Sequence, residues 1–196
     1  MKTDINNPVV LVHGIKDDSR RMEPMARYLR GQGRTAYAVT LKPSWGQVGI
    51  DQLAAQLDQF IKEKIPDSQK FDLVGFSMGG LVSRYYLQRM DGLRRVDHFI
   101  TLATPHHGTV MAWLAWNTGG SQMRPESAFL QDLNHDISTL DLVKFTSIWT
   151  PLDLMIVPAT SSHTGIGREI KIWMPAHPLM ALHPKCIRVV AAELLR

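Results

Sequence analysis

The chain has 196 residues, which is the length of one domain and enough to bury a core without a disulfide or a metal ion. Its hydrophobic share of 44% and charged share of 20% exclude intrinsic disorder, coiled coil and collagen. Lys and Arg outnumber Asp and Glu by 22 to 18, a net charge of +4, without forming a basic stripe. A nucleic-acid partner is therefore not expected.

The cysteine count and the hydropathy pattern indicate in which cellular compartment the protein is expected. The single cysteine, Cys186, cannot form an intramolecular disulfide, and the paired cysteines of zinc sites are absent. The apolar run after Pro8 has four residues, too short for a signal peptide, so we expect a cytoplasmic protein, or a secreted one if an upstream signal has been removed. Residues 98–123 carry no Asp, Glu, Lys or Arg, but His, Pro, Gly and Thr interrupt them, so a membrane span is not expected.

The first half of the chain alternates short apolar runs with segments of helical periodicity, which is typical of βαβ units. Val9–Val12 predicts a strand, and residues 22–29 predict a helix that ends at Gly31 and Gly33, before a β-prone run at 35–41. A helical stripe over 50–61 ends before Pro66. The strand predicted at 71–75 then runs into a helix over 81–86 almost without a loop.

The second half continues the same alternation. It predicts strands at 98–103, 145–149 and 169–173, a helix within 125–144, and a closing helix that Pro184 opens. We therefore expect one α/β domain over 1–196, with about six mostly parallel strands and helices on both faces. Right-handed crossovers place its functional site at the carboxyl ends of the strands.

The pentapeptide from Gly75 to Gly79 fits the pattern G-x-S-x-G, in which a serine occupies a sharp turn between a strand and a helix. The flanking strand and amphipathic helix are the setting that this turn requires. Glycines are needed because the backbone of the serine is strained and side chains two positions away would collide with the neighbouring elements. Ser77 is therefore the candidate nucleophile, and a plain glycine-rich turn is the alternative.

A serine nucleophile requires a base and a carboxylate, which we expect after the last two strands. Asp153 follows the strand at 145–149, and His177 follows the strand at 169–173. The order Ser77, Asp153, His177 is the one expected when the nucleophile follows a middle strand. The alternative acids lie in the helix expected within 125–144: Asp132, Asp136 and Asp141. The alternative bases are His163 and His183, although His183 precedes Pro184, where capping or packing is expected.

The first strand ends in a glycine turn, His13-Gly14-Ile15, beside the expected site. Backbone amides stabilise a developing oxyanion well because their direction is fixed. We assign this role to the N–H groups of Ile15 and Met78. His13 is interpreted as a residue that holds this loop by hydrogen bonding, with a second base as the alternative.

Four segments resemble the small bacterial triacylglycerol lipases and esterases of the α/β-hydrolase superfamily: residues 9–14, 75–86, 101–109 and 153–158. The resemblance implies hydrolysis of carboxylic esters by Ser77, Asp153 and His177, with little or no lid and no cofactor. Phe76 stands where many relatives carry histidine, which implies a different wall of the acyl site. An acyltransferase, a thioesterase or a non-catalytic binding module remains the alternative.

The loop at 104–108 resembles the family's loop that approaches the nucleophile. Its adjacent histidines, His106 and His107, suggest a metal site, but neighbouring side chains seldom point the same way and no carboxylate or cysteine lies at ligand spacing. A hydrogen-bonded loop is the interpretation that we favour, and no metal is expected.

Apolar residues near the site are candidates for contact with an acyl chain, with ordinary core packing as the alternative. These residues are Phe76, Met111, Trp113, Met155, Ile156, Val157 and Leu179. The partner that we expect is a small ester or a lipid, with at most transient contact with a lipid surface. Because the insertions are short, we expect an exposed cleft, short or medium acyl chains and weak dependence on an oil interface.

Overall fold

The computed structural model describes residues 7–196, in which six strands form one sheet of order β2-β1-β3-β4-β5-β6. Every neighbouring pair is parallel, so the carboxyl ends of the strands share one edge of the sheet. The predicted α/β architecture is confirmed. The strands are β1 (Val9–Val12), β2 (Ala36–Val39), β3 (Phe71–Phe76), β4 (Val96–Leu102), β5 (Lys144–Trp149) and β6 (Arg168–Lys171).

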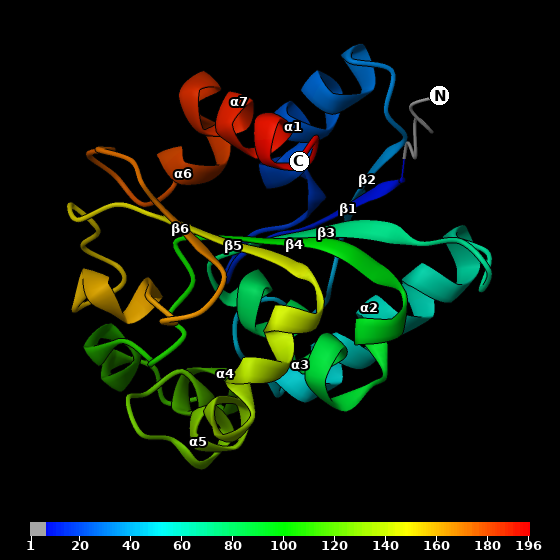
Figure 1. The fold of residues 1–196 in the computed structure, drawn as a ribbon. Coiled ribbons are helices and arrows are strands. Elements are labelled where there is room, and N and C mark those ends of the chain that lie inside the picture. The colour runs from blue at the N-terminus through cyan, green and yellow to red at the C-terminus, as the bar shows by residue number, and fades with distance from the viewer. Residues whose placement is uncertain (1–6) are drawn as a thin grey trace.

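Helices cover both faces of the sheet (Figure 1). One face carries α1 (Ser19–Gly31), α6 (Leu179–Leu182) and α7 (Pro184–Glu193). The other side holds α2 (Ile50–Lys64), α3 (Met78–Arg89), α4 (Thr118–Gln122) and α5 (Ala128–His135). Short 3-10 helices occupy Gly92–Arg94, Val110–Leu114, Ile137–Leu142 and Ala159–Ser162.

The sheet is buried on both faces, which explains the continuous apolar runs of its central strands. Val10 and Val12 of β1 point into the core beneath α2 and α3, whereas Val9 and Leu11 point into the core beneath α1, α6 and α7. All four side chains are fully buried. Each contributes roughly 1.5–3 kcal/mol of apolar transfer free energy.

The expected long elements are confirmed, with ends shifted by one to three residues. The last strand ends at Lys171 rather than at Trp173, and the helix expected within 125–144 is α5 followed by a 3-10 helix. The sequence did not predict α4 or α6, because segments of four or five residues are too short to show a helical period.

No helix among residues 7–196 combines the length and the apolar character needed to cross a bilayer. The expectation about a signal peptide rests on residues 1–8, of which 1–6 lie outside the described part of the chain.

One residue, Ser77, separates β3 from α3, and the chain reverses there with φ 55° and ψ −125°. The bend places the start of α3 against two strands. A Cβ atom at Gly75 would lie 2.6 Å from the Cα of Gly80, and one at Gly79 would lie 2.6 Å from the carbonyl oxygen of Val12 on β1. The predicted steric reason for both glycines is confirmed. Gly80 is equally confined, because a Cβ atom there would lie 2.7 Å from a methyl carbon of Thr104.

We expect Gly79→Ala to lower the free energy of unfolding by about 1–3 kcal/mol, because its methyl group must displace the backbone of β1. Gly31→Ala is the matched control: it lies at the end of α1 and nothing approaches its Cβ position within 4 Å. This control should stabilise the protein by up to about 1 kcal/mol. Urea unfolding of both variants measures the difference, and equal effects would contradict the close-contact argument.

Candidate active site

The side chain of Ser77 lies at the carboxyl edge of the sheet. Its N–H donates to the carbonyl of Leu102 on β4 at 2.8 Å, and its carbonyl accepts from the N–H of Gly80 at 3.0 Å. The residue is 6% exposed, it borders a cavity, and its Oγ has no hydrogen-bond partner among residues 7–196. The hydroxyl is therefore available to a molecule in the cavity.

The loops after β5 and β6 bring Asp153 and His177 together. His177 Nδ1–H donates to Asp153 Oδ2 at 2.7 Å, and both side chains are nearly buried. Asp153 Oδ1 accepts from the N–H groups of Met155 and Ile156, each at 2.9 Å. These three donors hold the carboxylate in one orientation, and the bond to Nδ1 leaves Nε2 of His177 as the basic nitrogen.

The imidazole of His177 packs on the ring of Phe76, with ring centroids 4.9 Å apart. The imidazole of His177 therefore lies beside the residue that precedes Ser77. Within the described residues no hydrogen bond joins Ser77 Oγ to His177. In hydrolases without substrate this bond is often long, and it tightens when substrate binds.

The alternative acids have other partners or face solvent. Asp132 and Asp136 each pair with Arg89 of α3 at 2.8 Å, and hydrogen bonding to Arg89 lowers the pKa of Asp136. Asp141 is exposed in the 3-10 helix before β5, at the opposite edge of the sheet. These positions favour Asp153 as the acid.

The alternative bases are also engaged elsewhere. The ring of His163 lies 4.2 Å from that of Trp149, and its Nδ1 is 3.5 Å from Glu169. His183 caps α7, since its Nδ1 accepts from the N–H of Lys185 at 3.2 Å, as expected from the proline that follows it.

The glycine turn after β1 lies against the bend at Ser77. A Cβ atom at Gly14 would be 3.1 Å from the Cβ of Ser77. His13 Nδ1–H donates to the carbonyl of Gly14 at 2.8 Å, and its Nε2 accepts from the N–H of Leu41 at 3.0 Å. With both nitrogens used and its pKa lowered by burial, His13 holds the loop as a neutral side chain, as interpreted from the sequence.

Two backbone N–H groups point to an anion site beside Ser77. Met78 is the first residue of α3, where helix N–H groups lack internal acceptors, and Ile15 lines the cavity. Neither N–H donates a hydrogen bond within the described chain. The oxyanion role assigned to them from the sequence stays a prediction.

The two adjacent histidines of the 104–108 loop point to different partners. His106 is fully buried: its Nδ1 accepts from Arg84 at 3.3 Å, and its Nε2–H donates to Thr101 at 3.1 Å. His107 accepts from Asn134 at 3.3 Å and is more exposed. Both side chains therefore hold this loop by hydrogen bonds.

Arg84 ties this loop to α5. It is completely buried, it donates to Asn134 at 3.0 Å and to the carbonyl of Leu133 at 2.7 Å, and burial lowers its pKa to about 9. No carboxylate of the described chain lies within ion-pair distance of its guanidinium. A cation without a counter-ion is stabilised here by neutral acceptors, and protonation of His106 would remove one of them.

A cavity of about 440 Å³ opens beside Ser77. Its walls come from the loops that follow β1, β2, β3, β4 and β5. The lining consists of Ile15, Lys16, Trp45, Ser77, Pro105, Thr109, Met111, Ala112, Leu114, Ala115, Trp116, Asn117, Met123, Met155 and Ile156.

Three of the residues predicted to contact substrate, Met111, Met155 and Ile156, line this cavity. The other four lie outside its lining. Phe76 packs beneath on His177, and Val157 donates from its N–H to Thr109 in the wall. Trp113 stacks under the guanidinium of Arg124 at 4.5 Å, and Leu179 packs in the core beneath α1, α6 and α7.

The charge-free stretch indicated Leu114 and Trp116 as possible contacts of an acyl chain, but the sequence did not single out Trp45, Thr109 or Asn117 as cavity residues. Trp45 follows β2 at the carboxyl edge, and this position was the available signal. Trp116 belongs to the charge-free stretch, but no local pattern shows that Asn117 donates to the carbonyl of Trp45 at 2.9 Å.

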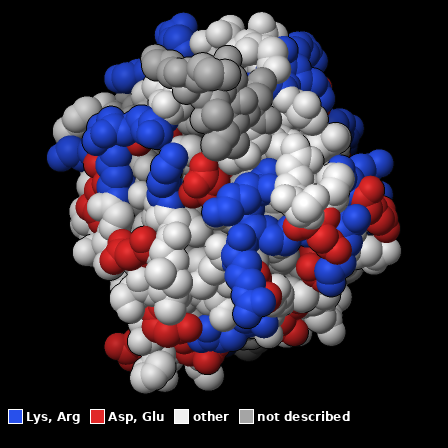
Figure 2. Space-filling model, turned by 45° about the vertical axis from the view of Figure 1, so that its right-hand side comes forward, with Lys and Arg blue, Asp and Glu red and all other residues white. Residues whose placement is uncertain are grey.

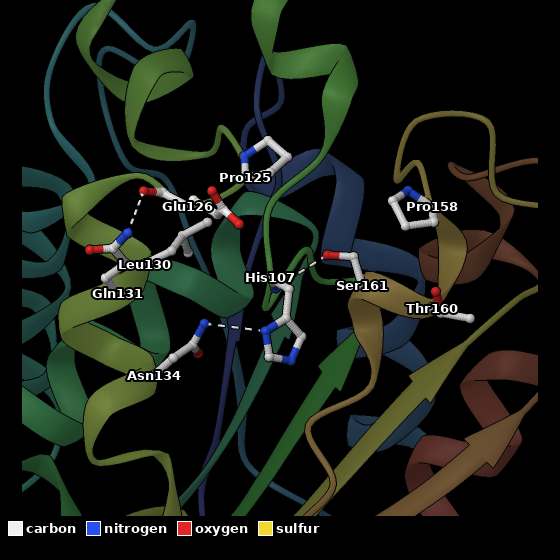
Figure 3. Close-up of a pocket in the computed structure, with 9 residues that line it drawn as sticks. All are labelled: His107, Pro125, Glu126, Leu130, Gln131, Asn134, Pro158, Thr160 and Ser161. Atoms are coloured by element: carbon white, nitrogen blue, oxygen red, sulfur yellow. Dashed lines mark hydrogen bonds between the residues drawn. The ribbon is translucent and has the colours of Figure 1, made fainter.

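A second hollow of about 480 Å³ lies between α5 and the loops at 105–108 and 158–161 (Figure 3). Its lining shares no residue with the cavity at Ser77. His107 is fixed there by Asn134 and, through its backbone N–H, by the hydroxyl of Ser161 at 3.2 Å (Figure 3). This hollow holds no serine or cysteine paired with a base.

Within residues 7–196, one group of acidic and histidine side chains is close enough to share an ion: Asp72, Asp97 and His98. It lies at the amino edge of the sheet, away from Ser77. Asp72 is already bound by Arg34 and by His98 Nδ1 at 2.9 Å, so its oxygens are occupied by protein donors. This arrangement is an internal ion-pair cluster.

Comparison with sequence families matches residues 8–126 to the model of palmitoyl protein thioesterase. The lysosomal thioesterase PPT2 of Mus musculus is 34% identical over 112 residues, covering 52% of this chain and 34% of that protein. Palmitoyl-protein thioesterase 3 of Dictyostelium discoideum is 28% identical over 108 residues, covering 52% and 36%. The chain therefore spans about a third of the curated relatives that it matches, and the matched family region contains Ser77 but not Asp153 or His177.

Solved structures of bacterial and fungal lipases share the fold. The mature lipase BlEst2 of Bacillus licheniformis superposes with a TM-score of 0.79 at 18% identity, covering 99% of this chain and 94% of that one. Lipase B of Aspergillus fumigatus superposes with a TM-score of 0.81 at 16% identity, covering 97% and 52%. These likenesses confirm the α/β-hydrolase fold that the sequence motifs implied.

We expect stability to fall in acid because burial holds the pKa of His106 well below the ordinary value of 6.5. The unfolded chain then binds a proton that the folded chain does not, so stability is present above about pH 6.5 and is lost as the pH falls below it. Between about pH 7 and about pH 5 this histidine alone accounts for up to about 2 kcal/mol of unfolding free energy.

His106→Gln should flatten the dependence of unfolding free energy on pH over that range, because a neutral amide can still accept from Arg84 and donate to Thr101. His135→Gln, at the exposed end of α5, is the control and should keep the wild-type slope. Urea unfolding across the pH range measures both slopes. An unchanged slope in His106→Gln would show that His106 is not the source of the pH dependence of stability.

Proposed function

We propose that this chain, which belongs to the palmitoyl protein thioesterase family, cleaves acyl esters by transferring the acyl group to Ser77 and then to water. The observation that carries the proposal is the hydrogen bond of 2.7 Å between His177 and Asp153, with the His177 ring packed on Phe76, the residue before the strained Ser77, which lines an apolar cavity. Each group has the chemical type and the environment that its role requires.

In the first half of the reaction, Ser77 Oγ attacks the ester carbonyl while His177 Nε2 takes the hydroxyl proton. The new C–O bond forms as the carbonyl π electrons move onto oxygen. Asp153 accepts from Nδ1–H and stabilises the imidazolium. The tetrahedral intermediate then collapses, the bond to the alcohol oxygen breaks, and the imidazolium gives the alcohol its proton.

In the second half, His177 takes a proton from water, and the hydroxyl oxygen attacks the acyl-Ser77 carbonyl. Collapse of this second intermediate releases the carboxylic acid and returns the proton to Ser77 Oγ. The same base serves both halves, because its orientation is fixed by Asp153 and by the ring of Phe76.

The N–H groups of Ile15 and Met78 stabilise the oxyanion in both halves. They are well suited because each lacks an acceptor within the described chain and because Met78 stands at the N-terminus of α3. His13 holds the Gly14–Ile15 turn in place and so fixes the direction of one of the two donors.

The acyl group is proposed to lie against the methionine-rich wall formed by Met111, Met123, Met155 and Ile156. A cavity of about 440 Å³ is within the usual range for a small ligand, so we infer short or medium acyl chains. Lys16 also lines the cavity, and we propose that its ammonium group meets the polar leaving group.

A thioester substrate is a second candidate, favoured by the family match and by the 34% identity to a lysosomal thioesterase. The attack on the carbonyl is the same. A thiolate leaves more readily than an alkoxide, so proton donation from His177 contributes less to this leaving step.

Ser77→Ala and His177→Gln should each lower kcat for a nitrophenyl ester by roughly 10⁴- to 10⁶-fold, since the first removes the nucleophile and the second removes the base. His163→Gln is the matched control, because it removes a histidine that packs on Trp149 instead, and it should retain activity within about tenfold. Steady-state rates of the purified variants measure these changes in kcat. Comparable losses in His163→Gln and His177→Gln would refute the assignment of the base.

An oxygen ester and a thioester with the same acyl chain distinguish the two substrate classes. We expect kcat/KM to rise with acyl length to medium chains and then to fall, because the cavity limits the bound length. Ser77→Ala should abolish the hydrolysis of both substrates. Cleavage of the thioester alone would show that the second candidate is correct, and a preference that rises without limit through long chains would contradict the assigned acyl wall.

A further inference from the structure

Four of the five tryptophans are more than half exposed, and all four lie beyond the carboxyl ends of strands. Trp116 is 94% exposed, an extreme value for such a side chain. Together with two exposed leucines they form what we call the apolar collar. The collar consists of Trp45, Trp113, Leu114, Trp116, Leu154 and Trp173.

The collar lies at the same edge of the sheet as the cavity. Its residues come from the segments that follow β2, β4, β5 and β6, and the carboxyl ends of parallel strands meet at one edge of the sheet. Trp45, Leu114 and Trp116 also line the cavity that contains Ser77. The exposed side chains of the collar are therefore gathered at the carboxyl edge of the sheet.

The segments that carry the collar are basic. Segments 42–50, 103–124, 150–158 and 171–185 contain one acidic residue, Asp153, and it is buried. Cations stand over three of the indole rings: Lys16 is 5.3 Å from Trp45, Arg124 is 4.5 Å from Trp113, and Lys171 is 5.8 Å from Trp173.

The acidic residues nearest to these segments in the sequence have partners within the protein, among them Asp51, which accepts from Gln122 at 3.0 Å. Asp17 and Asp18, in the loop after β1, pair with Arg21 and Arg20. Glu126 lines the second hollow instead. By contrast, Figure 2 shows a face on which basic and acidic side chains lie interspersed.

We propose that the apolar collar docks on the surface of an anionic lipid bilayer. Indole rings with adjacent Lys or Arg suit the boundary between acyl chains and charged headgroups, where one end of the side chain is apolar and the other is wet. The cations match a negative headgroup layer. A second copy of this chain fits less well, because a two-fold contact through the collar would bring like charges together.

Docking in this orientation points the mouth of the cavity at the membrane. An acyl chain can then pass from the bilayer toward Ser77 along an apolar path. This goes further than the transient contact expected from the sequence. The surface needs only the collar and its cations, so it stands or falls separately from the proposed chemistry at Ser77.

Vesicle flotation tests the surface with the Ser77→Ala variant, so that lipid cleavage cannot complicate binding. The probes are vesicles of phosphatidylcholine alone and of phosphatidylcholine mixed with phosphatidylglycerol. We expect the protein to bind the mixed vesicles and to bind phosphatidylcholine alone at least about fivefold more weakly. Added salt should reduce binding to the mixed vesicles. Failure to bind the anionic vesicles, or equal binding to both, overturns the proposal.

Two leucines provide a matched pair. Leu114 in the collar is 74% exposed, and Leu142, before β5 at the opposite edge, is 75% exposed. In the Ser77→Ala background, Leu114→Ser should lower the partition coefficient about tenfold, whereas Leu142→Ser should leave it unchanged. Equal losses from the two changes refute the location of the surface.

Replacing the cations beside the collar tests the electrostatic part of the proposed binding. Arg124→Gln and Lys171→Gln should each weaken binding to anionic vesicles about fivefold and should hardly change binding to phosphatidylcholine. Thermal melting confirms that the variants are folded. Sedimentation of the free protein tests whether a second copy of this chain covers the collar instead. A dimer that Trp116→Ser dissociates would overturn the proposal.

Discussion

The arrangement of the site depends on how closely α3 approaches β1 and β3. Ser77 keeps a positive φ, a conformation that costs roughly 1–3 kcal/mol in a non-glycine residue, because its N–H is bound by β4 and its carbonyl by Gly80. The approach is possible only where Gly75, Gly79 and Gly80 lack side chains. Packing of α3 against the sheet therefore holds the strain, and the strain lifts the hydroxyl toward the cavity.

The two edges of the sheet differ in what surrounds their polar groups. At the amino edge, Asp72 is bound by Arg34, by His98 and by the amide of Asn7, so that its oxygens are occupied within the protein. At the carboxyl edge, the Oγ of Ser77 and the N–H of Met78 have no partners among the described residues. A buried group without a partner is costly, so it persists where a bound molecule can complete it. At the amino edge, His98 Nε2 and Arg34 Nε also lack partners in the described part of the chain, but Ser77 borders a cavity that a molecule can enter.

The sequence predicted those parts of the molecule that depend on local patterns. The apolar runs at β1 and β3, the strand-to-helix bend at Ser77, and the position of Asp153 and His177 after successive strands could all be read from spacing. Contacts between distant loops could not. The wall of the cavity depends on Gly119 N–H donating to the carbonyl of Gly46 at 2.8 Å, across 73 residues, and neither segment carries a periodic signal. Leu179 was expected at the site but lies in the core, because a helix of four residues does not show from sequence which side it buries.

Around the cavity, a rigid frame carries adaptable side chains. Thr109 donates to the carbonyl of Met155 at 2.8 Å and accepts from the N–H of Val157 at 3.0 Å, which ties the loop after β4 to the loop after β5. This seam fixes the backbone on either side of the space where the proposed carbonyl group lies. The surfaces proposed to meet the acyl chain are methionines, whose flexible thioethers adjust to different shapes. The rigid frame would hold the reacting carbonyl group precisely, and the methionines would tolerate different acyl chains. Discrimination between substrates should therefore depend more on the carbonyl and the leaving group than on the details of the acyl chain.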